Sequence, residues 1–78
     1  MELYFLELGW GAVQNSLRTG NTGMALGNGS SQMNVNEAYY LVLHRGKMKW
    51  YSRRDPTLER WLFRNQAHIT QLFVFGIK

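Results

Sequence analysis

The chain has 78 residues, no cysteine, and nine Lys and Arg residues against five Asp and Glu, which gives a formal net charge of +4. A chain of this length forms a single domain, 1–78, with a small core, and the lack of cysteine excludes disulfides and thiolate zinc sites. Apolar residues make up 45% of the chain, which is too much for a disordered protein, while the positive charge favours anionic partners.

The first segment, Glu2 to Leu8, is a short apolar run with apolar side chains on both faces. We expect an interior strand that is covered on both sides. The run has no basic segment before it and is far too short to span a bilayer, so it is neither a secretory signal nor a membrane anchor. These features predict a soluble, cytoplasmic protein that has no contact with a membrane.

Gly9-Trp10-Gly11 ends this strand, and we expect Trp10 to plug the core there rather than to serve as an exposed anchor. Gly, Asn and Ser dominate the following stretch and predict a long flexible loop at about 14–37. A short helical turn near Ala12–Leu17 and a weak strand around Met24–Leu26 are the local alternatives. No phosphate-binding glycine pattern is present, so we interpret the loop as a connector or as a segment that becomes ordered on a partner.

The stretch from Ala38 to Arg54 predicts a β-hairpin. Two runs rich in aromatic and aliphatic residues, 38–44 and 48–51, flank Arg45-Gly46, where Gly46 can take the positive φ of a two-residue turn. Side chains alternate across a strand. In this register one face, which we expect to be the core face, carries Tyr39, Leu41, Leu43, Met48 and Trp50.

The other face of the hairpin is basic and is predicted to be exposed. It carries Tyr40, Val42, His44, Lys47, Lys49, Tyr51 and Arg53. Arg45 and Arg54 extend this surface, and Arg18 can approach it from the loop. Lysine and arginine neutralise phosphates and tyrosine stacks on bases, so a nucleic-acid interface is one hypothesis. The alternative is a solvated face whose lysines keep the sheet from pairing with other chains.

The segment after the hairpin predicts a helix that Asp55 caps, with Pro56 at its first position and its end near His68. Its apolar stripe is Leu58, Trp61, Leu62, Asn65 and Ile69. Phe63 lies off this stripe and is therefore a candidate contact residue. Thr70 to Ile77 is apolar on both faces and predicts a central strand.

These elements predict an α+β fold. It has a small four-stranded antiparallel or mixed sheet in the order β-loop-β-β-α-β, one helix packed on one face, and a long Gly-rich loop.

No pattern in the chain indicates a catalytic residue, a cofactor or a metal ion. The two histidines, His44 and His68, have no carboxylate near them in sequence, and no serine lies in a nucleophile motif. One enzymatic alternative remains, a small metal-independent ribonuclease that uses His44 with the lysines, Tyr51 and Arg53 of the basic hairpin face.

The sequence thus predicts a non-enzymatic binding protein, a regulator or inhibitor that occludes a macromolecular protein partner. Small regulators of this kind, including those encoded by mobile elements, often have this profile. A basic nucleic-acid-binding module is the alternative, and the small core is also compatible with a homodimer. The candidate binding residues, for protein or nucleic acid, are Tyr40, Lys47, Lys49, Tyr51, Arg53, Arg54, Arg18 and Phe63.

Overall fold

The computed structural model describes residues 2–20 and 37–78, which form one antiparallel sheet and two α-helices. The elements in chain order are β1 (Leu3–Leu8), α1 (Trp10–Thr19), β2 (Glu37–His44), β3 (Lys47–Ser52), α3 (Leu58–Asn65), a 3-10 turn (Gln66–His68) and β4 (Ile69–Ile77). The strands lie in the order β1-β4-β2-β3, and every neighbouring pair is antiparallel. The predicted α+β fold with a four-stranded antiparallel sheet is confirmed.

Two expectations about the helices need correction. Residues 2–20 and 37–78 contain two α-helices where one was predicted, because the helical turn considered near Ala12–Leu17 is part of the ten-residue helix α1. The predicted loop at 14–37 therefore begins with residues that are helical up to Thr19. The rest of that loop, with the weak strand considered around Met24–Leu26, falls on residues 21–36, outside the described part of the chain.

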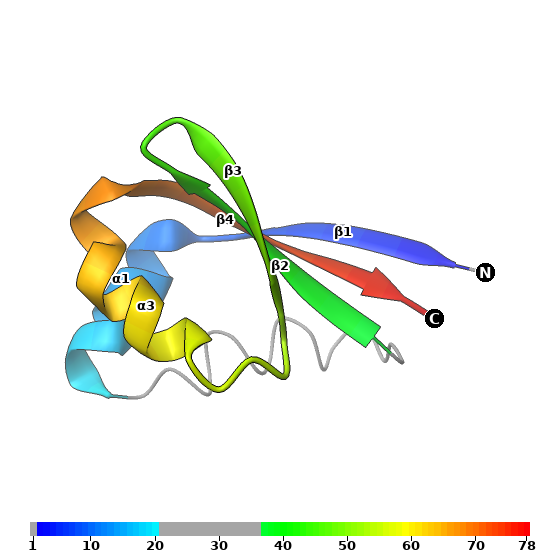
Figure 1. Cartoon of the computed structure of the whole chain (residues 1–78), viewed down its shortest axis with the longest axis horizontal. Coiled ribbons are helices and arrows are strands. Elements are labelled where there is room, and N and C mark those ends of the chain that lie inside the picture. The colour runs from blue at the N-terminus through cyan, green and yellow to red at the C-terminus, as the bar shows by residue number, and fades with distance from the viewer. Residues whose placement is uncertain (1, 21–36) are drawn as a thin grey trace.

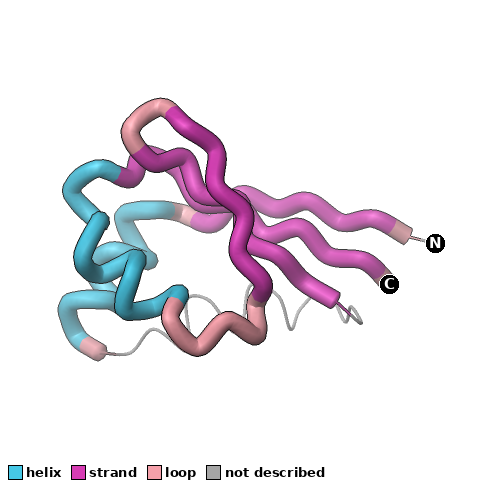
Figure 2. The backbone as a smooth tube through the Cα atoms, viewed as in Figure 1, coloured by secondary structure: helices cyan, strands magenta, loops and turns pink. Residues whose placement is uncertain are grey.

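Both helices lie on the same side of the sheet, near the end where β1 finishes and β4 starts (Figures 1 and 2). Each presents a pair of apolar residues at the i, i+4 spacing that places two side chains on one face, Val13 and Leu17 in α1 and Leu58 and Leu62 in α3. The core between helices and sheet consists of Leu8, Val13, Leu17, Ala38, Tyr40, Val42, Leu58, Leu62, Ile69, Leu72 and Val74.

Trp10 opens α1 and packs against this core as a half-buried side chain, which agrees with the predicted plug. α3 begins at Leu58 with Thr57 as its N-cap, two residues later than the predicted start at Pro56. Ahead of it, Asp55 Oδ1 accepts hydrogen bonds from the backbone N–H of Thr57 at 2.8 Å and from its hydroxyl at 2.6 Å. These two bonds, the hydroxyl first, lower the pKa of Asp55. The 3-10 turn then extends the helical segment to His68, where the sequence predicted its end.

The positions of β4 and β1 in the sheet agree only partly with the prediction. β4 lies between β1 and β2, so the predicted central strand is confirmed. Among the described strands β1 lies at an edge of the sheet, and the expectation of an interior strand covered on both sides is wrong. Most of its side chains are exposed, and only Leu8 is buried. Apolar residues on both faces of a short run were therefore a poor guide to burial in β1.

The hairpin has the predicted register, with Tyr40 opposite Tyr51 and His44 opposite Lys47. The turn residues Arg45 and Gly46 both have positive φ, 52° and 77°. This is the pattern of a type I′ turn, whose twist matches that of the two strands.

The two faces of this hairpin are the reverse of the prediction. Tyr40 and Val42 point toward the helices and are 1% and 0% exposed, whereas Met48 and Trp50 of the expected core face are 68% and 56% exposed. Alternation determines which side chains share a face, but it does not determine which face the helices cover. That choice depends on the path of the chain through α1 and α3.

No helix in residues 2–20 or 37–78 combines the length and the apolar character needed to cross a membrane.

Candidate functional site

The sheet surface opposite the two helices, here called the open face, has no described element packed on it (Figure 2). All four strands contribute to it through alternate residues. By register and alternation its side chains are those of Leu3, Phe5, Glu7, Glu37, Tyr39, Leu41, Leu43, Met48, Trp50, Ser52, Gln71, Phe73, Phe75 and Ile77.

Aromatic rings form a continuous row across the open face. Phe5 of β1 stacks on Phe73 of β4 with ring centroids 5.0 Å apart, and its edge contacts Phe75 at 6.5 Å. From the other edge of the sheet, Trp50 of β3 contacts Phe75 edge-on at 6.1 Å. Leu41 lies opposite both Trp50 and Phe73 and is only 8% exposed because these rings flank it. The rings thus hold one another in place while staying accessible from solvent.

Charge on the open face is sparse and negative. Glu7 accepts a 3.5 Å hydrogen bond from the side-chain amide of Gln71, and at the end of β2 Glu37 accepts one from the Tyr39 hydroxyl at 3.0 Å. That bond, together with the charge of Glu37 and burial, raises the pKa of Tyr39, while the positive charge of Arg54 opposes the shift. None of the strand positions on the open face is a Lys or Arg.

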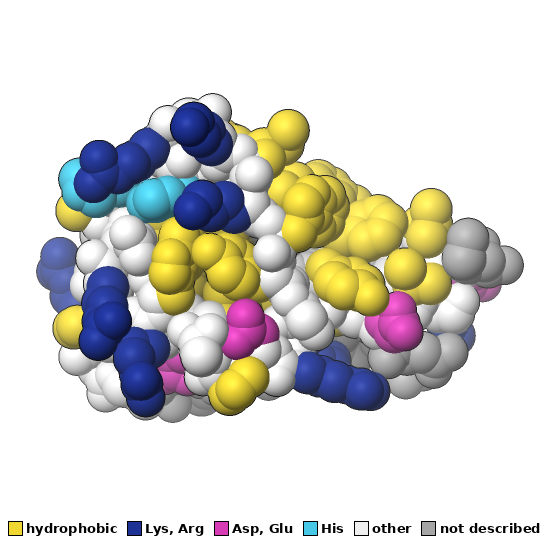
Figure 3. Space-filling view, in the orientation of Figure 1, with side chains coloured by type: hydrophobic (Ala, Val, Ile, Leu, Met, Phe, Trp, Pro, Cys, Tyr) yellow, Lys and Arg dark blue, Asp and Glu magenta, His cyan; other side chains and the backbone are white. Residues whose placement is uncertain are grey.

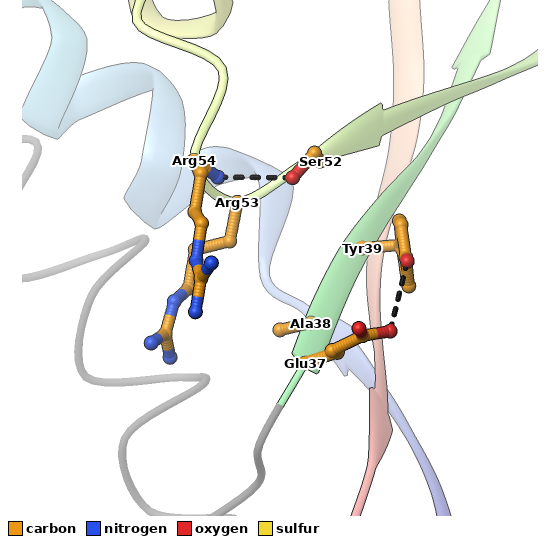
Figure 4. Close-up of a pocket in the computed structure, with 6 residues that line it drawn as sticks. All are labelled: Glu37, Ala38, Tyr39, Ser52, Arg53 and Arg54. Carbon is orange, nitrogen blue, oxygen red and sulfur yellow. Dashed lines mark hydrogen bonds between the residues drawn. The ribbon is translucent and has the colours of Figure 1, made fainter.

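A cleft of about 220 Å³ lies beside Glu37 and Tyr39, at the end of the β2–β3 hairpin. Arg53 and Arg54 line it, and Figure 4 shows both of their side chains pointing to the side of β2 away from the Tyr39 ring. The backbone N–H of Arg54 donates to the Ser52 hydroxyl at 3.2 Å. The two predicted binding residues are therefore close together and exposed, but they are not part of the open face.

The predicted basic hairpin face lies on the helix side of the sheet, and its tyrosines are not free to stack on bases. Tyr40 is in the core. Tyr51 is half-buried and packs on Trp61 with ring centroids 4.9 Å apart, and the ammonium of Lys49 lies 5.6 Å from the centre of the same indole. The aromatic part of this predicted nucleic-acid surface is thus used for packing against α3.

The cations at the hairpin tip do gather, in a surface that we call the cationic corner: Arg45, Lys47 and Lys49, with the imidazoles of His44 and His68 beside them. The rings of His44 and His68 lie 6.4 Å apart, and the Arg45 N–H donates to the His68 carbonyl at 3.0 Å. Figure 3 shows Lys, Arg and His side chains together at this end and hydrophobic side chains gathered over the strands.

His44 is poorly placed for proton transfer to a substrate. Its ring packs edge-on against Trp61 at 4.9 Å, and its Nε2 atom is buried without a hydrogen-bond partner. Burial, followed by the charges of Lys49 and Arg45, lowers the pKa of His44. A general acid or base must reach the reacting atom, so the geometry at His44 adds no support to the ribonuclease alternative.

The remaining predicted residues lie apart from both surfaces. Arg18 is exposed in the last turn of α1, and Phe63 is 52% exposed on α3. Phe63 lines a shallow hollow of about 360 Å³ together with Leu17, Pro56 and Arg60. Within residues 2–20 and 37–78, no three His, Asp or Glu side chains lie close enough together to hold a metal ion.

Sequence reasoning missed the open-face aromatics of β1 and β4, namely Phe5, Phe73 and Phe75. The sequence does show that both strands have apolar residues on both faces. We interpreted this pattern as burial on both sides of the sheet, whereas one side is the open face. Comparisons with protein-family models, curated proteins and solved structures found no match to this chain.

Proposed function

We propose that this chain is a non-enzymatic binding protein whose open face docks on a protein partner and occludes an apolar surface of that partner. The observation that carries the proposal is the aromatic row, which ends in side chains that remain largely exposed. Phe5 is 58% and Trp50 56% exposed, and Met48 beside Trp50 is 68% exposed.

Burial of these side chains would contribute substantially to binding. Removing a large apolar side chain from water contributes roughly 1.5–3 kcal/mol. Contiguous exposed apolar patches mark interaction sites on soluble proteins, and Trp, Tyr, Phe and Met are enriched where proteins meet. The rings of the open face also contact one another before any partner arrives, so little side-chain freedom would be lost on docking.

The charges indicate the chemistry of the partner. Glu7 and Glu37 are the carboxylates associated with the open face, so a partner with an apolar centre and Lys or Arg at its rim would be complementary. Phosphates placed on this face would meet carboxylates and no strand cation, which favours protein over nucleic acid here.

The test compares two substitutions in the same strand, Trp50→Ser on the open face and Lys47→Ser on the helix side. Partners are captured from lysate with nuclease present, and the affinity of the purified partner for each variant is then measured. We expect Trp50→Ser to weaken binding at least about 30-fold, the effect of losing a hot-spot residue worth about 2 kcal/mol. Lys47→Ser should leave the affinity within about twofold, because Lys47 lies on the helix side of the sheet, outside the proposed docking face.

The reverse result, with affinity lost in Lys47→Ser and kept in Trp50→Ser, would contradict docking through the open face. A second candidate function is binding of nucleic acid at the cationic corner. A capture repeated without nuclease tests it: partners that are lost on nuclease treatment and in Lys47→Ser would support this function. The observation in favour of that candidate is that Arg45, Lys47 and His68 are all exposed at one end of the sheet.

A further inference from the structure

The outer edge of β1 is a free strand edge in the part of the chain that the structure describes. β1 pairs with β4 along its whole length, from Leu3 opposite Ile77 to Leu8 opposite Leu72, and with no other described strand. Figure 1 shows β1 running out past the two helices toward the N-terminus. Of the two described helices, neither covers most of its length.

The backbone groups that face outward along this edge can be assigned. The N–H of Lys78 donates to the carbonyl of Glu2 at 3.0 Å, so Glu2 and Lys78 form a hydrogen-bonded pair at the start of the β1–β4 ladder. Hydrogen-bonded and non-hydrogen-bonded pairs alternate along an antiparallel ladder. Glu2, Tyr4, Leu6 and Leu8 therefore bond to β4, and the N–H and C=O groups of Leu3, Phe5 and Glu7 point away from it.

The two edges of the sheet differ in how they are protected against pairing. On β3, Lys47 and Lys49 supply the charges that natural edge strands use to discourage pairing. β1 has no Lys, Arg or Pro and no bulge, and Leu3, Phe5 and Leu6 are large exposed side chains along it. A regular edge that is mostly apolar, with Glu7 as the only charge in β1, is suited to accept another strand.

The sequence of β1 is complementary to itself in antiparallel register. We propose that the free edge of β1 pairs with the same edge of a second copy of this chain, with Phe5 opposite Phe5 of the second copy on the two-fold axis. In this register Leu3 lies opposite Glu7, Tyr4 opposite Leu6 and Glu2 opposite Leu8. No acidic residue is placed opposite another, and the outward groups of Leu3, Phe5 and Glu7 meet the same groups of the other copy.

This arrangement is a closed two-fold contact in which one patch serves both copies. It makes one continuous eight-stranded sheet and joins the two open faces on the same side, with the Phe5 rings adjacent at the centre. The contact uses backbone groups at the sheet edge and needs no other protein. It is therefore independent of whether the open face docks on a partner.

The first experiment is the mass in solution, measured by sedimentation equilibrium over a range of protein concentrations. We expect a concentration-dependent shift from the 9.1 kDa monomer to twice that mass. Phe5→Lys should abolish the dimer because it places two ammonium groups opposite each other on the two-fold axis. Trp50→Lys changes the same open face at the β3 edge, and we expect the dimer to persist.

A monomer at every concentration would overturn the proposal. So would loss of the dimer in Trp50→Lys, because the contact would then be through the open face and not through the edge.

Amide hydrogen exchange of the unaltered chain tests the edge without a substitution. In the monomer, at low concentration, the N–H groups of Leu3, Phe5 and Glu7 should exchange rapidly, while those of Tyr4, Leu6 and Leu8 are protected by β4. At concentrations that favour the dimer, the first three should become protected as well. Rapid exchange of these three amides in the dimer, or their protection in the monomer, would overturn the proposal.

Discussion

At the scale of single residues, burial separates side chains that the sequence places next to each other. In α3, Leu62 is fully buried against the core, and the adjacent Phe63 is 52% exposed. The helical spacing already placed Leu62 on the apolar stripe and Phe63 off it. For this pair, the helical periodicity was sufficient to predict which residue is buried, because α3 packs on the core through one side only.

We expect opposite outcomes when these two neighbours are truncated. Leu62→Ala should lower the free energy of unfolding by about 2–5 kcal/mol, because it leaves a cavity in the core. Phe63→Ala should change it by no more than about 0.5 kcal/mol, as for other exposed positions. Urea denaturation of both variants measures the difference. A large loss of stability in Phe63→Ala would show that the ring packs more closely than its exposure indicates.

The candidate binding residues show where residue-level prediction failed. Lys47, Arg53 and Arg54 are exposed as predicted, yet Tyr40 lies in the core and Tyr51 packs on Trp61. A tyrosine on a strand has the same local pattern whether its face is covered or open. Only the position of the helices distinguishes the two cases.

At the scale of elements, the hairpin is the part of the fold most fully specified by its own sequence. Its register follows from the two-residue turn, in which Arg45 and Gly46 both adopt positive φ. Glycine takes this conformation without a steric penalty, whereas arginine with its Cβ does not. The turn therefore contains one favourable and one strained residue.

Substitutions in this turn should have opposite effects on stability. Gly46→Ala should lower the free energy of unfolding by about 1–2 kcal/mol, since a Cβ is unfavourable at positive φ. Arg45→Asn should raise it by up to about 1 kcal/mol, because asparagine is favoured at the first position of a type I′ turn. Thermal or urea denaturation checks both values.

Arg45→Gln is the matched control for the lost charge. It removes the guanidinium and keeps a side chain with no preference for positive φ, so its stability should stay near that of the parent. If Arg45→Gln stabilises the fold as much as Arg45→Asn, the gain comes from charge and not from the turn.

At the scale of the whole molecule, the aromatic row and the lysines of β3 lie on opposite sides of one sheet. Phe5, Trp50 and Glu7 are on the open face, while Lys47, Lys49 and the arginines of α3 are on the helix side, where Phe63 is also exposed. A net charge of +4 therefore describes the helix side better than the sheet surface proposed for docking. Substitutions in the cationic corner should therefore affect binding of polyanions without affecting docking of a protein on the open face.

The double variant Lys47→Glu/Lys49→Glu should weaken binding of single-stranded RNA at low salt. The slope of log affinity against log salt should fall by about 0.7 for each phosphate that the variant no longer neutralises. Lys78→Glu is a control for net charge. β4 starts at the cationic corner, where Ile69 lies opposite His44, and Lys78 follows its other end. A weakening in Lys78→Glu as large, per charge reversed, as in the double variant would contradict a localised site.

The sequence by itself determined the features that depend on neighbours along the chain. These are the hairpin with its register, the apolar stripe of α3, the termination of that helical segment near His68, and the apolar strand β4. Turn chemistry and side-chain periodicity act within a few residues, so they can be recognised without the fold.

Only the tertiary structure decided which face of the sheet is covered and which strands are edges. The alternation of the hairpin is the same whichever of its faces the helices cover. Its local pattern therefore does not reveal that Tyr40 is buried and Trp50 is exposed. The location of β1 at the edge likewise follows from β4 pairing between β1 and β2, a contact between segments far apart in sequence. Burial is a property of the packed chain, and for this protein it places the proposed docking face on the side that the sequence alone assigned to the core.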